Sequence, residues 1–195
     1  MEMDGNRVEI IEERTLYKGW SYLREFIINY TRTDGIVEKQ TREIYNSGDG
    51  AAVLMYNATE RKVLLIRQFR LPVLLNNHVD GFILECPAGM LDELDPQKAI
   101  TKEIMEETGY QTSQVQKVYE AFATPGAHME KIHFYIASYD QSMKTSLGGG
   151  QKSEQEDIEV IEYDFSEIQD LLKTGKIIDA KTIILLQWAL LNLVK

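Results

Sequence analysis

Three glutamates, Glu103, Glu106 and Glu107, have the residue type and the spacing that most clearly suggest chemistry in this sequence. Separations of three and four positions place side chains next to one another on a helix, where like charges repel by roughly 0.2–0.5 kcal/mol per pair. Carboxylates gathered in this way can bind a hard divalent cation, which prefers oxygen ligands. The alternative is a solvated charged helix face, which is the commoner use of an acidic helix.

The helix that would position these glutamates has clear start and stop signals within residues 87–110. Asp95 is a preferred N-cap residue, Pro96 suits the first helical position, and Gly109 would stand just past the last turn. A strand end and a tight glycine loop precede the helix. The sequence therefore predicts a strand, a glycine loop and a capped acidic helix in succession.

Two of the three carboxylates fall on the apolar side of this helix. Counted from Pro96 at roughly 100° per residue, Glu103 lies at about 340° and Glu107 at about 20°. This sector lies between the apolar residues Ala99 and Ile100, so both carboxylates should face the protein interior. Buried carboxylates stay ionised only when they are paired or bound to metal, so the inward placement favours a metal site.

The composition indicates an acidic globular protein. The chain has 195 residues, 44% of them hydrophobic, which suits one domain or one domain with a dimerising arm. Its net charge of −10 argues against nucleic acid as a partner, because binding a phosphate backbone requires a basic face. The single cysteine, Cys86, favours a reducing compartment. The polar N-terminus and the lack of an apolar run of about 18 residues favour a cytoplasmic protein without a membrane helix.

The rest of the chain alternates strand and turn signals. Residues 7–45 contain two extended runs around Asp34 and Gly35, a strong hairpin signal. This order of elements predicts an α+β fold with mixed or antiparallel strands around a core. Further strands are expected at 51–57, 62–69, 81–86, 115–126, 130–140 and 157–164.

A long polar loop and two helices complete the C-terminal part. Residues 140–156 read as a loop, with the run Gly148–Gly150 as its flexible part. Ser166 is expected to cap a helix that ends at Gly175, and residues 180–193 read as a strongly apolar final helix.

The glycine loop and the acidic helix together resemble the Nudix box of the Nudix hydrolase superfamily. The family pattern is G-x5-E-x7-R-E-U-x-E-E-x-G-U, with U a bulky apolar residue, and the half from Glu103 to Tyr110 matches it fully. Asp95 replaces the first glutamate, Lys102 replaces the arginine, and the spacer between them is one residue short. These substitutions affect a scaffolding ion pair more than the metal ligands, so an active enzyme is still expected.

Segments outside the box resemble the ADP-ribose pyrophosphatase-like branch, namely LLIRQFR, ECPAG and TPGAHMEKIHFYIA. Within that branch, the short spacer, GGG…EDIEV and TGKIIDAKT are most similar to GDP-mannose pyrophosphatases. The resemblance implies an α/β/α Nudix sandwich with a mixed sheet over residues 46–195. It also implies an N-terminal antiparallel strand region, residues 1–45, that builds a homodimer and reaches the partner's active site.

Carried over by position, the resemblance implies a metal site and a set of substrate contacts. The metal ligands would be the carbonyl of Ala88 and the side chains of Glu103, Glu107 and Glu156, oxygen donors that suit Mg²⁺, with Mn²⁺ as the alternative. Glu106 would complete the metal cluster or its surroundings. The implied nucleotide-sugar contacts are Trp20, Thr41, Arg42, Arg70, Ala88, Glu130, Gln155 and Lys181.

Several of these roles have a simpler alternative. Arg42, Arg70 and Lys181 could bind phosphate oxygens or form surface ion pairs. Glu130 could act as the general base or remain a solvated loop glutamate. Trp20 could stack on the nucleobase or belong to a protein interface.

Cysteine, histidine and the second tryptophan are interpreted as structural. Cys86 lies in an apolar strand without a partnered histidine, so a core thiol is favoured over a catalytic nucleophile. The histidines His78, His128 and His133 lack metal-ligand spacing, and Trp188 lies among leucines, as in a core or a dimer contact.

The sequence thus predicts a Mg²⁺-dependent Nudix pyrophosphatase that hydrolyses GDP-mannose to GMP and mannose 1-phosphate. The reaction class depends on the box, and the substrate depends on the resemblance of the whole chain. An ADP-ribose or other ADP-sugar pyrophosphatase is the nearest alternative. A nucleotide-binding sensor without turnover and a structural dimer module are the other classes, and the intact glutamates argue against a degenerate sensor.

Overall fold

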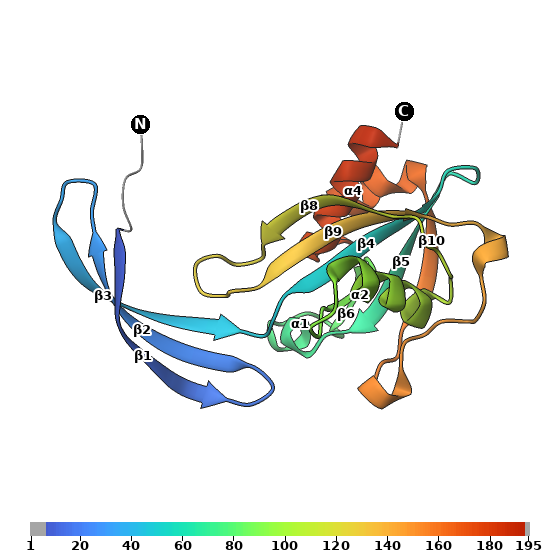
Figure 1. The fold of residues 1–195 in the computed structure, drawn as a ribbon. Coiled ribbons are helices and arrows are strands. Elements are labelled where there is room, and N and C mark those ends of the chain that lie inside the picture. Colours follow the sequence, from blue (N-terminus) through green and yellow to red (C-terminus); the bar gives the residue numbers. More distant parts are fainter. Residues whose placement is uncertain (1–6, 194–195) are drawn as a thin grey trace. The chain divides into compact units, whose positions relative to one another are not determined.

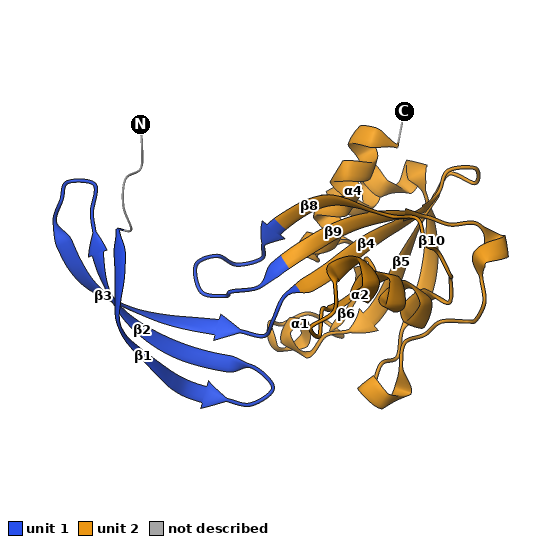
Figure 2. Ribbon diagram, viewed as in Figure 1, with its two compact units in different colours: residues 1–49, 121–131 blue, residues 50–120, 132–195 orange. Residues whose placement is uncertain are grey.

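The computed structural model describes residues 7–193, and these form two compact units (Figure 1, Figure 2). Unit 1 comprises the residues up to Asp49 together with Ala121–Lys131, and unit 2 comprises Gly50–Glu120 and the residues from Ile132 onward. Among the described residues, no helix combines the length and the apolar character needed to cross a membrane.

The described part of unit 1 is built on a three-stranded antiparallel sheet of β1 (Val8–Lys18), β2 (Tyr22–Thr31) and β3 (Val37–Asn46). The predicted hairpin at Asp34 and Gly35 joins β2 to β3, and Gly35 has the left-handed φ of +85° that glycine tolerates. The segment Ala121–Lys131 is bound to the end of β3. There the N–H of Tyr45 donates to the carbonyl of Ala127 at 2.8 Å.

Unit 2 contains a mixed sheet, seven-stranded within residues 7–193. The strand order is β10-β5-β4-β9-β8, with β6 beside β5 and β7 beside β4. Strand β4 runs parallel to β9 and antiparallel to β5 and β7. The strands are β4 (Gly50–Asn57), β5 (Lys62–Phe69), β6 (Phe82–Glu85), β7 (Ala88–Met90), β8 (Val115–Phe122), β9 (Lys131–Ser138) and β10 (Glu159–Asp164).

Alternation along the central strands creates a core on each face of this sheet. In β4, Ala52 and Leu54 belong to one core, and Val53 and Met55 belong to the other. The first core is covered by α3 (Ile168–Lys173) and α4 (Ala180–Asn192), and the second by α2 (Pro96–Glu103). Figure 1 shows α4 and α2 on opposite faces of the sheet. The predicted α+β sandwich with a mixed sheet is confirmed.

Several local features differ from the sequence-based expectation. The acidic helix does not stay α-helical to its end, because Ile104–Thr108 form the π-helix η1. The glycine loop contains the short strand β7, and a short helix α1 (Leu71–Leu75) follows β5. The polar loop carries the 3₁₀ turns η2 (Gln141–Met143) and η3 (Lys152–Glu154). Its glycine run is hydrogen-bonded to the end of η1, a contact that the sequence did not predict.

The helix expected to begin at Ser166 begins two residues earlier. Asp164 is the N-cap of the 3₁₀ turn η4 (Phe165–Glu167) that leads into α3, and Ser166 is exposed. The backbone N–H of Asp164 donates to Glu167 Oε2 at 2.8 Å in a capping box. The prediction of Ser166 as the cap is therefore wrong, because serine and aspartate are both good caps and sequence alone does not fix the register.

Replacing Glu167 should destabilise the protein more than replacing Ser166. Glu167→Ala removes a charged acceptor from the first helical turn, a loss of about 0.5–1 kcal/mol. The melting temperature measured by circular dichroism should fall by about 1–4 °C. Ser166→Ala, the matched control, should leave it nearly unchanged. Equal effects of the two substitutions would contradict this assignment of the cap.

Candidate functional site

The glutamates singled out by their spacing lie on α2 and on η1, which continues it. The Asp95 side chain accepts the N–H groups of Gln97 and Lys98 at 3.1 and 3.3 Å. At the other end Gly109 has a left-handed φ of +77°, and a Cβ there would overlap the carbonyl oxygen of Ser146. The predicted start and stop signals are therefore confirmed, and Gly109 is required by both conformation and space.

Glu107 and Glu103 face inward from this helix. Glu107 is 1% exposed. Its Oε2 accepts the N–H of Ala88 at 3.1 Å, whereas its buried Oε1 has no hydrogen-bond partner among residues 7–193. The half-buried Glu103 lies against Gly89, where a Cβ would overlap the carboxyl group. The glycine loop thus provides both an N–H donor and the space that two inward carboxylates need.

The surroundings of these carboxylates disfavour their charged forms. Burial raises the pKa of Glu103 to about 7, against the opposing effect of Lys102. Burial also raises the pKa of Glu107 well above its ordinary value, and the charge of Glu103 adds to this rise. Glu156 raises the pKa of both residues. Two or three ionised carboxylates in this arrangement require a positive charge among them.

The loop before β10 brings Glu156 into this group. Glu156 Oε2 accepts the backbone N–H of Gln151 at 2.9 Å. The side-chain amide of Gln151 donates to Glu106 Oε1, and Lys102 Nζ lies 2.9 Å from Glu106 Oε2. Glu106 is therefore paired with a lysine and an amide, in contrast to Glu107.

The donor chemistry of the group fits a divalent cation. All the predicted ligand atoms are oxygens, and Glu107 Oε1 is buried without a partner among the described residues. Within residues 7–193, no three metal-ligating side chains converge into a ready-made cage. We therefore expect the carboxylate side chains to move closer together when a cation binds.

A pocket of about 280 Å³ opens beside Glu156. It brings together Arg70, Gln155 and Glu156, three residues that the sequence assigns to substrate or metal binding. Its polar character suits a phosphorylated ligand better than an apolar one. The complete lining is Gln68, Phe69, Arg70, Phe82, Glu154, Gln155, Glu156 and Asp157.

Arg70 and Lys181 meet at the carboxylate of Glu85, whose side chain is 4% exposed. Arg70 Nε lies 2.7 Å from Glu85 Oε2, and Lys181 Nζ lies 3.5 Å from Glu85 Oε1. Lys181 also lies 2.7 Å from Asp179, which caps α4 by accepting the N–H of Thr182. Arg70 and Lys181 thus form ion pairs, which was the alternative to phosphate binding. Their shared partner, Glu85, is however a buried carboxylate and not a surface group.

The network around Lys181 keeps this lysine protonated. Burial lowers its pKa, but Asp179 and Glu85 more than offset that effect, so the pKa is raised. Sequence reasoning missed Glu85 and Asp179. The signal for Glu85 is a carboxylate at the end of an otherwise apolar strand, directly before the glycine loop.

The remaining predicted site residues, Trp20, Thr41, Arg42 and Glu130, belong to unit 1. Trp20 is 76% exposed in the turn between β1 and β2. Arg42 is exposed on β3 and donates to the carbonyl of Thr41 at 3.0 Å, and Glu130 Oε2 lies 3.6 Å from His128 Nδ1. The structure does not bring these residues together with the carboxylates within one unit, and their roles stay predictions.

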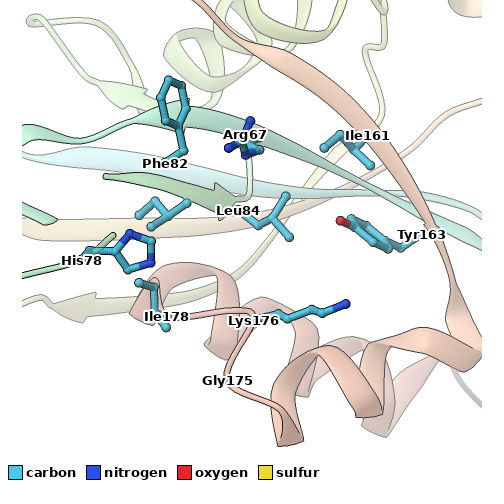
Figure 3. Close-up of a pocket in the computed structure, with 10 residues that line it drawn as sticks. Arg67, His78, Phe82, Leu84, Ile161, Tyr163, Gly175, Lys176 and Ile178 are labelled. Atoms are coloured by element: carbon cyan, nitrogen blue, oxygen red, sulfur yellow. The ribbon is translucent and has the colours of Figure 1, made fainter. Parts of the chain in front are cut away.

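A second pocket, of about 300 Å³, shares Phe82 with the first (Figure 3). In Figure 3, Leu84 lies between His78 and Tyr163, and Lys176 runs beneath Tyr163. The guanidinium of Arg67 stacks on Phe82 at 4.6 Å. None of the predicted site residues lines this pocket within the described chain, so it is not the candidate site.

The residues interpreted as structural have structural surroundings. Cys86 is buried, its backbone N–H donates to Thr182 Oγ1 at 2.7 Å, and burial raises the pKa of its thiol. This environment is that of an inert core thiol. His128 Nε2 lies 3.0 Å from Ser47 Oγ, and Trp188, on α4, packs against the core that α3 and α4 cover.

The pKa of Glu103 predicts a pH-dependent stability in the absence of divalent cations. Its folded-state value of about 7 lies above the ordinary value of 4.5, so the folded state binds this proton more tightly. The stability gained in this way is complete below pH 4.5 and is lost as the pH rises to about 7. In EDTA, the unfolding free energy of Glu103→Gln should therefore decline less over this range than that of the wild type.

Urea denaturation at several pH values measures this difference. The exposed Glu93, at the end of the glycine loop, provides the matched control Glu93→Gln, which should follow the wild-type profile. Coinciding profiles for all three proteins would show that burial of Glu103 does not perturb its titration.

Comparisons with known proteins agree with this architecture. Residues 46–186 match the NUDIX domain model, and residues 7–45 match the GDP-mannose pyrophosphatase NudK N-terminal domain model. The chain is 42% identical over 185 residues to a GDP-mannose pyrophosphatase of Pectobacterium atrosepticum, covering 95% of each chain. It is 44% identical over 180 residues to that of Cronobacter sakazakii, covering 92% of this chain and 93% of the relative.

A crystal structure of an ADP compounds hydrolase has the same fold. Its TM-score is 0.71 at 16% sequence identity, over 96% of this chain and 97% of that chain. The resemblance inferred from the box and its flanking segments is confirmed. The chain belongs to the Nudix family, within the group of the GDP-mannose pyrophosphatases.

Proposed function

We propose that the protein is a divalent-cation-dependent pyrophosphatase that hydrolyses GDP-mannose to GMP and mannose 1-phosphate. The observation that carries the reaction class is the inward pair Glu103 and Glu107, with an unpartnered buried oxygen on Glu107 within the described chain. The substrate follows from relatives that carry this name and are more than 40% identical to nearly the whole chain.

The cation, Mg²⁺ or alternatively Mn²⁺, would be held by the carbonyl of Ala88 and by Glu103, Glu107 and Glu156. A divalent cation at such a site neutralises the pyrophosphate and lowers the pKa of the attacking water. The raised pKa values of Glu103 and Glu107 support this assignment, because a cation among them would restore their ionised forms. Glu106 would act from beside the cation, since Lys102 and Gln151 already pair with it.

Residues of this chain would bind and orient the nucleotide sugar around the cation. Arg70 can form the bidentate phosphate contacts that a guanidinium favours, and Lys181 adds a second positive charge. Glu85 supports both roles because it contacts both side chains. Gln155 lines the same pocket as Arg70 and would contact the sugar or the base.

Four residues of unit 1 would complete the substrate contacts. Trp20 would stack on the base, Thr41 and Arg42 would bind the nucleotide, and Glu130 would take the proton of the attacking water. The exposure of Trp20 and Arg42 supports the roles of these two residues, because exposed side chains remain available to a ligand.

We also propose a division into an N-terminal strand region, residues 1–45, and a Nudix domain, residues 46–195, in a cytoplasmic homodimer. The described part of unit 1 contains one three-stranded sheet and no helix, so within this unit the sheet lacks the second layer that usually buries an apolar face. A second copy of the chain could provide that layer. Large apolar side chains are exposed on these strands, including those of Ile10, Tyr17 and Val37.

A substrate panel tests the proposed activity. Purified protein is incubated with GDP-mannose, ADP-ribose or ADP-glucose, with Mg²⁺ or with EDTA, and the products are separated by chromatography. We expect GMP and mannose 1-phosphate to form fastest, and only with the cation. Preference for ADP-ribose would show that ADP-ribose, and not GDP-mannose, is the substrate. Nucleotide binding without any product would favour a nucleotide-binding sensor.

Replacing Glu107 by glutamine should lower the hydrolysis rate by at least about 100-fold, through loss of a charged metal ligand. Circular dichroism should show an unchanged fold, because glutamine has nearly the same shape as glutamate. Glu93→Gln should retain the wild-type rate, since Glu93 is exposed. A near wild-type rate for Glu107→Gln would remove this residue from the metal site.

A further inference from the structure

The glycine run Gly148–Gly150 is bonded to the C-terminal end of η1. The N–H of Gly149 donates to the carbonyl of Glu107 at 2.8 Å, and that of Gly150 donates to the carbonyl of Glu106 at 3.1 Å. Carbonyls in the last turn of a helix lack partners within the helix, and these two receive theirs from the loop. The loop therefore fixes the backbone of Glu106 and Glu107, the two residues of η1 whose side chains belong to the candidate site.

This contact requires glycine in two respects. Gly148, Gly149 and Gly150 have successive left-handed φ values of +71°, +104° and +80°, which other residues rarely adopt. A Cβ on Gly148 would lie 2.5 Å from the carbonyl oxygen of Glu107, and one on Gly150 would lie 2.6 Å from Glu156 Cβ. Both contacts are far shorter than van der Waals distance, so a side chain at Gly148 would push the loop away from η1, and a side chain at Gly150 would displace Glu156.

The same segment then leads to Glu156. The N–H of Ile158 donates to the carbonyl of Gly149 at 3.2 Å, which closes a short loop with Glu156 inside it. Gln151 connects the two sides, because its amide donates to Glu106 and its backbone N–H donates to Glu156. Glu156 thus depends on the glycine contact for its position relative to the helix.

We propose that Gly148–Gly150 and Gln151 form a clamp that positions Glu156 against Glu103 and Glu107 and thereby sets the affinity of the site for a divalent cation. A ligand on a loose loop would lose conformational freedom on binding, and the clamp removes that cost beforehand. The clamp residues are positioning residues. The inference rests on the proposed function only in identifying the cation as the cofactor of hydrolysis.

Binding of Mn²⁺ to the full-length chain without substrate tests the clamp, with free Mn²⁺ measured by electron paramagnetic resonance. Gly148→Ala should weaken Mn²⁺ binding by about 10- to 100-fold, the range found when groups that orient metal ligands are removed. Gly175→Ala is the matched control. Gly175 has the same φ of +71°, but a Cβ added there would meet no atom within 4 Å, so this variant should bind Mn²⁺ like the wild type.

Gln151→Ala provides a second test that adds no backbone strain. It removes the amide contact to Glu106 and should also weaken Mn²⁺ binding. The rate of GDP-mannose hydrolysis should then be closer to the wild-type rate at saturating Mn²⁺ than at low Mn²⁺. If Gly148→Ala does not fold, Gln151→Ala decides the question. Wild-type affinity in every folded clamp variant would overturn the proposal, even if melting temperatures fall.

The wild-type protein separates this proposal from the proposed function. Tight Mn²⁺ binding that the clamp variants weaken, without hydrolysis of GDP-mannose, would support the clamp and contradict the substrate. Hydrolysis of GDP-mannose with equal Mn²⁺ affinities in wild type and clamp variants would support the substrate and contradict the clamp. Absence of Mn²⁺ binding by the wild type would contradict both.

Discussion

The burial of Glu107 beside Glu103 is the constraint on which the rest of the candidate site depends. A carboxylate oxygen that is buried without a partner in the described chain is costly, and a second carboxylate nearby increases the cost. The surrounding elements reduce that cost only in part, through the N–H of Ala88 and the positive charge of Arg70. A divalent cation would supply the remaining compensation, so the site is organised around a charge that the chain itself does not contain.

A second arrangement of charges accompanies the first. The protein is acidic, with a net charge of −10, and a phosphorylated substrate would be repelled unless local cations offset that charge. Arg70 and Lys181 provide such cations, and Glu85 and Asp179 hold them in place. The buried carboxylates of unit 2 therefore have two distinct uses, since Glu107 lacks a full complement of partners while Glu85 orients two basic side chains.

The helix and its chemistry can be predicted from sequence because their signals are local. Asp95 and Gly109 mark the helix ends, and helical periodicity alone places Glu103 and Glu107 on the inner side. The hairpin at Asp34 is local in the same sense. The π-helix η1 is not predictable in this way, because it depends on how the end of the acidic helix packs against the loop and not on a residue pattern.

The parts that sequence reasoning missed depend on contacts between distant segments. Glu85 pairs with Lys181 across nearly a hundred residues, and no periodicity reports such a contact. The pattern of Gly148–Gly150 predicts flexibility because glycine permits it, whereas here the lack of a side chain permits close packing. A glycine in a loop can therefore indicate either a flexible backbone or a closely packed one, and only the neighbouring atoms show which applies.

Anomalous diffraction from crystals soaked in Mn²⁺ tests the central claim most directly. We expect an anomalous peak bound by the side chains of Glu103, Glu107 and Glu156 and by the carbonyl of Ala88. A peak elsewhere, or saturating Mn²⁺ with no peak between Glu103 and Glu107, would contradict the claim.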